Sequence, residues 1–95
     1  MVEAHTVAPT VAPTAEQIAK HFSGMDACVA LINDTVADDT DALEAYLSAD
    51  EVKLMVTRNT EHLEIQAAKD WYSDSSKSKT PYTSAVAAGK AYVAG

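Results

Sequence analysis

Residues 48–72 read SADEVKLMVTRNTEHLEIQAAKDWY, a segment that contains neither Pro nor Gly. Ser48 is a favourable N-cap residue, and Glu51 follows three places later, which is the spacing of a capping box. No helix-breaking residue follows before Asp74. These signals predict one long helix over residues 49–72.

This predicted helix has apolar residues on two faces. At about 100° per residue, one face carries Val52, Met55, Val56, Leu63 and Ala67. The nearly opposite face carries Leu54, Ile65, Ala68 and Tyr72. A surface helix needs only one apolar stripe. We therefore expect this helix to be the centre of a small helical domain, or to be covered partly by a second copy of the chain.

The N-terminal residues differ from the rest of the chain. The tetrapeptide Val-Ala-Pro-Thr occupies residues 7–10 and is repeated at residues 11–14. Each Pro disfavours helix and biases the preceding residue toward extended backbone. We expect residues 1–14 to form an extended or disordered arm, and residues 15–95 to form a single helical domain.

Three further helices are predicted around the long one. Thr14 and Gln17 have capping-box spacing and start a helix over residues 15–33, whose apolar stripe consists of Ile18, Phe22, Met25, Val29 and Ile32. A short helix is expected over residues 40–47. Thr80 as N-cap, with Pro81 after it, predicts a last helix over residues 81–93. The predicted fold class is all-α, a small bundle of three main helices plus one short helix.

Composition limits the partners of this chain. It has 95 residues and a formal net charge of −7. No block of Lys or Arg could follow a phosphate backbone, so we expect no nucleic-acid partner. An anionic membrane surface would repel the chain, and no apolar run approaches the roughly 18 residues of a membrane span. We interpret the acidity first as a source of solubility.

The single cysteine, Cys28, cannot form an internal disulfide, and no second Cys supports a zinc site. A reducing compartment follows most simply. The N-terminus also lacks a basic-then-apolar signal pattern. We therefore expect a cytoplasmic protein, or a virion component if the chain is encoded by a phage.

Three groups of residues could carry chemistry, and each has a simpler explanation. The loop of Asn33, Asp34, Asp38, Asp39 and Asp41 offers oxygen ligands, but it lacks the EF-hand register, and helix capping explains it better. His21, Cys28 and His62 could approach one another, yet no third group would orient a base. Trp71, Tyr72, Tyr82 and Tyr92 could form an exposed binding cluster, but a clamp that closes the turn between two helices is simpler. We therefore expect no enzymatic activity, no metal and no cofactor.

Several segments together resemble small uncharacterised helical proteins of marine bacteriophages, particularly those that infect cyanobacteria. The resemblance rests on MDACVALI at residues 25–32, the acidic loop after it, VTRNTEHL at residues 56–63, AKDW at residues 68–71 and the final short helix. It covers most of residues 15–95 and defines no catalytic residues. It implies a virion, assembly or host-interaction component.

Two functions follow as hypotheses. The first is a non-enzymatic helical interaction module that acts by self-association, as expected of a homo-oligomeric phage virion or assembly protein. Its dimer contact would use Leu54, Ile65, Ala68 and Tyr72, because an uncovered apolar stripe is a patch that soluble monomers usually avoid. The alternative is a small acidic regulatory or inhibitor-like protein that binds a basic host partner.

Overall fold

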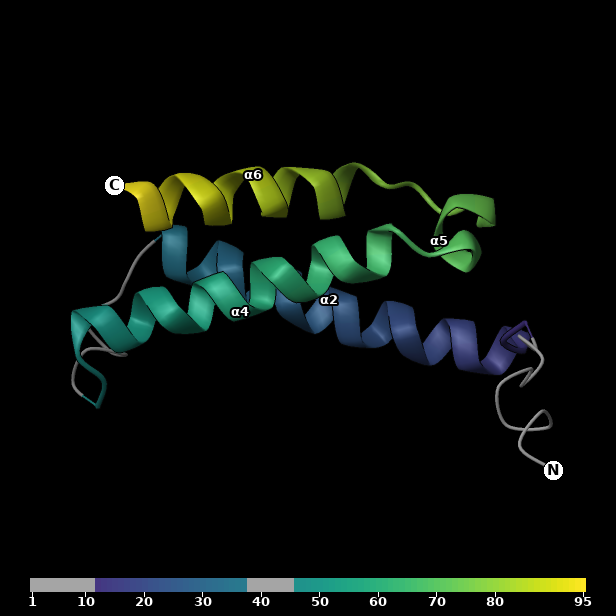
Figure 1. Ribbon diagram of the computed structural model, residues 1–95, viewed down its shortest axis with the longest axis horizontal. Helices are drawn as coiled ribbons and strands as arrows, with labels where there is room; N and C mark the ends of the chain where they lie inside the picture. The colour runs from purple at the N-terminus through teal and green to yellow at the C-terminus, as the bar shows by residue number, and fades with distance from the viewer. Residues whose placement is uncertain (1–11, 38–45) are drawn as a thin grey trace, which may run out of the picture.

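The computed structural model describes residues 12–37 and 46–95. Within these ranges the chain forms four helices and no strand: α2 (Ala15–Ala37), α4 (Ala49–Ala67), α5 (Asp70–Asp74) and α6 (Thr80–Ala94). The three long helices pack against one another in every pairwise combination, and the short α5 lies at one end of the bundle (Figure 1). The predicted all-α fold class is confirmed.

Two sequence predictions fall mostly outside the described residues. Of the predicted arm, only residues 12–14 are described, and they are not helical. Of the predicted short helix over residues 40–47, only Tyr46 and Leu47 are described, and they form a turn and a bend. The short helix that the structure does describe is α5, which was not predicted.

The core lies where the three long helices meet. It includes Phe22, Met25 and Ile32 of α2, Val52, Val56 and Leu63 of α4, Tyr72 of α5, and Tyr82 and Ala85 of α6. Ile18 and Val29, which complete the predicted α2 stripe, are partly buried against this cluster. The predicted apolar faces of α2 and of the first side of α4 are therefore the faces that form the core.

Both predicted capping boxes are present. The backbone N–H of Gln17 donates to Thr14 Oγ1 over 3.1 Å, and the backbone N–H of Thr14 donates to Gln17 Oε1 over 2.9 Å. Ser48 and Glu51 exchange the same two bonds at the start of α4, over 3.1 and 2.8 Å. Each box satisfies two of the N–H groups that a helix start leaves unpaired.

The long helix ends earlier than predicted. α4 ends at Ala67, and Lys69 has extended backbone before α5 begins. In an unbroken helix, Tyr72 would lie two turns after Ile65 and on the same outer face. The break turns Tyr72 inward instead, where its side chain is buried in the core. The prediction of one helix over residues 49–72 is wrong because the burial of this aromatic side chain outweighs helix continuity.

Other helix ends also differ from the prediction. α2 continues past Asn33 to Ala37. Its last turn contains Thr35, which is buried and donates its hydroxyl to the backbone oxygen of Leu31 over 2.8 Å. α6 begins at Thr80 itself, and Lys79 occupies the N-cap position without a side-chain cap. Pro81 lies in the first turn as predicted.

Two glycines inside helices have opposite surroundings. A methyl group added at Gly24 would meet nothing within 4 Å, so no other helix packs closely at this position. Gly89 of α6 instead faces α4, where an added methyl would collide with Thr60 Oγ1 and contact Ile32 Cγ2 at 3.5 Å. The missing side chain at Gly89 therefore sets how closely α6 approaches α4.

We predict that Gly24→Ala raises the free energy of unfolding by about 1 kcal/mol, because it gains helix propensity without a clash. Gly89→Ala gains the same propensity but overpacks the helix contact, which typically costs about 1–3 kcal/mol. It should be less stable than Gly24→Ala in urea unfolding. The double variant Gly89→Ala with Thr60→Ala should recover part of the difference. Equal stability of the two single variants would contradict this account of the α4–α6 contact.

Candidate functional site

The end of the bundle near α5 is built from aromatic rings. Phe22, Tyr72 and Tyr82 come from three different helices, and their ring centroids are 5.7–6.0 Å apart. Trp71 packs edge-on against Phe22 at 5.2 Å and stacks on His21 at 4.9 Å. These rings join α5 to α2 and α6, as the clamp interpretation of the sequence predicts. Tyr92, the fourth predicted member, does not belong to the cluster.

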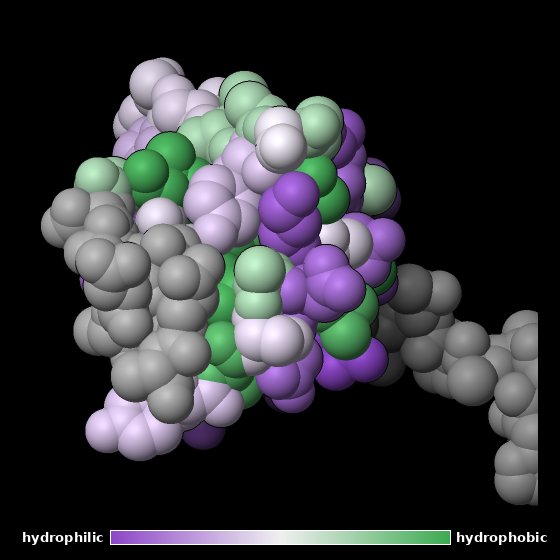
Figure 2. All heavy atoms as spheres, turned by 90° about the vertical axis from the view of Figure 1, so that its left-hand side faces the viewer, coloured by the Kyte–Doolittle hydropathy of each residue, from purple (hydrophilic) through white to green (hydrophobic). Residues whose placement is uncertain are grey.

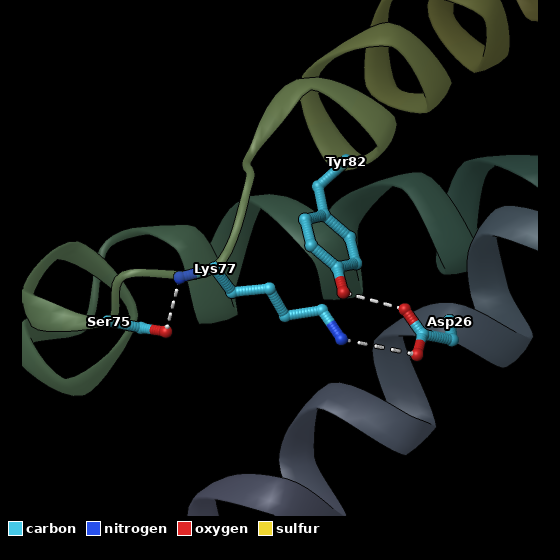
Figure 3. Close-up of polar contacts among 4 residues, drawn as sticks. All are labelled: Asp26, Ser75, Lys77 and Tyr82. Atoms are coloured by element: carbon cyan, nitrogen blue, oxygen red, sulfur yellow. Dashed lines mark hydrogen bonds and ion pairs between the residues drawn. The ribbon is translucent and has the colours of Figure 1, made fainter.

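A polar network lies beside the aromatic cluster, and Figure 3 shows its members Asp26, Ser75, Lys77 and Tyr82. The hydroxyl of Tyr82 donates to Asp26 Oδ1 over 2.6 Å, and the ammonium of Lys77 lies 3.8 Å from Asp26 Oδ2. The backbone N–H of Lys77 donates to Ser75 Oγ, which holds the loop in place. The side-chain ammonium of Lys77 also lies 5.1 Å above the ring of Phe22. One carboxylate therefore ties α2 both to α6 and to the loop that precedes α6.

The electrostatics of this network favour a protonated tyrosine. Burial raises the pKa of Tyr82 far above its ordinary value, and the hydrogen bond to Asp26 and the charges of Asp26 and Tyr72 raise it further. Burial also raises the pKa of Tyr72. Tyr82 thus keeps its proton: it is a persistent hydrogen-bond donor and a weak acid. The arrangement can hold the helices together, and we assign it a structural role.

A second lysine stabilises the loop from the other side. The ammonium of Lys79 donates to the backbone oxygens of Ser75 and Lys77 over 2.7 and 2.8 Å. It also lies 5.2 Å above the ring of Tyr72. Lys77 and Lys79 are two residues apart and contact different rings, so the loop that carries them is fixed against the cluster.

The predicted self-association residues are divided by the structure. Leu54 and Ile65 are 48% and 57% exposed on the outer side of α4, and Ala68 is also exposed. Tyr72 is only 6% exposed. Three of the four residues thus lie on one exposed surface, which we call the α4 outer face, and Tyr72 belongs to the core instead.

Two hollows lie beside this face, in the groove between α4 and α6. The first has a volume of about 410 Å³ and mostly apolar walls, formed among others by Leu63, Ala67, Ala68, Tyr72, Tyr82 and Val86. The second has a volume of about 270 Å³ and includes Thr57, Thr60, Glu61 and Gly89 in its walls. Glu64 lines both, and its carboxylate pairs with the ammonium of Lys90 at 2.7 Å. The sequence alone does not predict this groove, because the groove depends on how α6 packs against α4.

The end of the bundle near the start of α4 and the C-terminus has a different surface. Hydrophobic and hydrophilic residues alternate there, and no single large apolar patch is visible among the coloured atoms (Figure 2). The α4 outer face with its adjacent groove is therefore the candidate surface that we consider further.

The other predicted candidates are not brought together as a reactive site. His21 stacks on Trp71, Cys28 is partly buried with its thiol pKa raised by that burial, and His62 is exposed. Across residues 12–37 and 46–95, no three His, Cys, Asp or Glu side chains are grouped closely enough to hold a metal ion. Most of the predicted Asp-rich loop, including Asp38, lies outside the described residues.

Comparison with protein families, with curated proteins and with solved structures finds no match to this chain. None of the described helices is long and apolar enough to cross a membrane. The α4 outer face and the groove beside it are therefore interpreted from their geometry alone.

We predict that Tyr82→Phe lowers the free energy of unfolding by about 1 kcal/mol, because it removes the hydrogen bond to Asp26 and leaves the ring in place. Tyr92→Phe is the matched control, since Tyr92 makes no side-chain hydrogen bond with any described residue. Urea unfolding of both variants at neutral pH measures the difference. Equal stability of Tyr82→Phe and Tyr92→Phe would show that the Asp26 contact contributes nothing.

The raised pKa of Tyr82 also predicts a loss of stability in alkali. In the unfolded chain this tyrosine ionises near pH 10, whereas in the folded protein it keeps its proton to higher pH. Its contribution is therefore complete below about pH 10 and decreases as the pH rises above that value. Thermal unfolding from pH 8 to 11 should show a steeper decrease for the wild-type chain and for Tyr92→Phe than for Tyr82→Phe. Parallel curves for the three proteins would contradict the assignment.

Proposed function

We propose that this chain is a non-enzymatic helical interaction module that acts by self-association through the α4 outer face. The observation that carries the proposal is the exposure of Leu54 and Ile65, two large apolar side chains on one side of one helix. A core drawn from 95 residues is small, and association is a common way to cover further apolar surface.

The distribution of charge supports this choice of surface. Residues 1–45 contain eight acidic residues and only one basic residue, Lys20, so they account for the whole net charge of −7. Residues 46–95 contain six acidic and six basic residues. Two copies that meet through α4 therefore contact each other through residues 46–95, the half of the chain whose acidic and basic residues are equal in number. The electrostatic repulsion expected from the total charge of −7 is reduced in such a contact.

The resemblance to small phage proteins suggests where such a module would act. A self-associating helical domain suits a virion or assembly component, and this remains part of the proposal. The acidic first half favours the alternative function, a regulatory protein that binds a basic partner. The two functions differ in salt dependence, because contact with a basic partner weakens strongly at high ionic strength, whereas a mainly apolar self-association weakens little.

We predict that Ile65→Asp shifts the chain from dimer to monomer without unfolding it. The substitution places a charge in the proposed contact, and Ile65 is too exposed for its replacement to disrupt the core. Val36→Asp is the matched control, because Val36 is 42% exposed but lies on α2. Analytical ultracentrifugation gives the oligomeric state, and circular dichroism confirms folding.

Each result tests a separate part of the proposal. A wild-type chain that stays monomeric at high concentration would refute self-association. A dimer that Ile65→Asp leaves intact would show that the contact lies elsewhere. A dimer that Val36→Asp also dissociates would mean that added charge, rather than the α4 outer face, controls association.

A further inference from the structure

We propose that Ile65 of each copy inserts into the first hollow between α4 and α6 of a second copy, while Arg58 pairs with the partner's Glu61. The inference rests on the proposed self-association and specifies its geometry. It gives the groove one occupant, which is a second copy of this chain. The proposal follows from four features of the described residues.

The first feature is the position of Ile65 relative to the hollow. Ile65 and Glu64 are successive residues of α4, so their side chains are about 100° apart around the helix. Glu64 lines the hollow, whereas Ile65 is 57% exposed beside it. The projecting side chain and the hollow therefore lie next to each other, and both occur at residues 63–68 along α4.

The second feature is symmetry. In a dimer whose two α4 helices run parallel, the two-fold axis lies between them and runs parallel to both. Rotation about this axis moves a side chain from the left side of the contact to the right side but keeps its position along the helix. Such an axis places Ile65 of each copy opposite the hollow of the other. Both copies then bury the same side chain in the same hollow, and the contact closes as a dimer.

The third feature is charge complementarity. Arg58 and Ile65 are seven residues apart, and their side chains lie within about 20° of each other around α4. Arg58 is exposed and has no ion-pair partner among the described residues. The same axis that places Ile65 in the first hollow brings Arg58 to the second, whose wall includes Glu61 and Glu64. Glu64 is already paired with Lys90, so Glu61 is the partner for Arg58.

The fourth feature is spacing. Seven residues of helix separate Arg58 from Ile65 by about 10 Å. At 1.5 Å per residue, the mean position of the wall residues that α4 gives to the first hollow lies roughly 8 Å from the mean position of those it gives to the second. The corresponding separation along α6 is roughly 12 Å. The two projecting side chains therefore match the two hollows in distance.

The test uses two variants of the full chain that should fail separately and succeed together. Ile65→Ala removes the inserted side chain, and Thr83→Trp fills the hollow from an exposed wall position on α6. Each variant alone should dimerise at least about tenfold more weakly than wild type. Ser84→Trp is the matched control, because Ser84 is exposed on α6 but does not line the hollow; it should dimerise like wild type.

An equimolar mixture of Ile65→Ala and Thr83→Trp should form a heterodimer. Its Thr83→Trp chain supplies an intact Ile65, and its Ile65→Ala chain supplies an open hollow. The introduced Trp fills the space that the missing Ile65 leaves on the other side. Native mass spectrometry distinguishes the heterodimer from both homodimers by mass and should show it as the dominant dimer.

The outcomes separate this inference from the proposed function. A wild-type monomer would overturn both. A dimer that Ile65→Ala weakens but Thr83→Trp does not would overturn insertion and leave self-association through α4 standing. Absence of a preferred heterodimer would also overturn insertion.

In a dimer of labelled and unlabelled wild-type chains, nuclear Overhauser contacts between Ile65 methyl protons and the partner's Tyr82 ring would support insertion without any substitution, and their absence would oppose it.

Discussion

Burial of the Tyr72 ring is the constraint on which most of this structure depends. The ring packs 6.0 Å from both Phe22 and Tyr82, and it can reach them only because the chain leaves the helical path after Ala67. The break places Trp71 on His21 and leads the chain into the loop whose lysines lie over the rings. It also makes Tyr72 and Ala68 walls of the first hollow and leaves Ile65 exposed beside them.

The magnitudes explain why the break is favourable. Burial of an aromatic side chain removes roughly 150–250 Å² from water, which is worth about 4–6 kcal/mol at 25 cal/mol per Å². Against this, the hydroxyl of Tyr72 is buried without a hydrogen-bond partner among the described residues. Such a group costs about 1–3 kcal/mol. The gain from the ring exceeds the loss at the hydroxyl, so the ring is buried even though its oxygen is unsatisfied.

Local sequence signals predicted the parts of the fold that depend on local interactions. Both capping boxes and the apolar stripe of α2 follow from residues three or four places apart, and all are present. The hydrogen bond between Asp26 and Tyr82 joins residues 56 places apart, and no local pattern indicates it. The close contact of Gly89 with Thr60 and the hollows beside it likewise depend on how two helices meet.

The α4 outer face shows how far sequence alone could define the candidate site. Helical periodicity placed Leu54, Ile65 and Ala68 on one side of the helix, and all three are exposed there. It placed Tyr72 with them only because it assumed an unbroken helix. The same break that removes Tyr72 from this face adds the hollow beside it. An apolar stripe of four residues thus becomes a projecting side chain next to an apolar hollow, and that pairing suits a second copy of the same surface better than a flat stripe does.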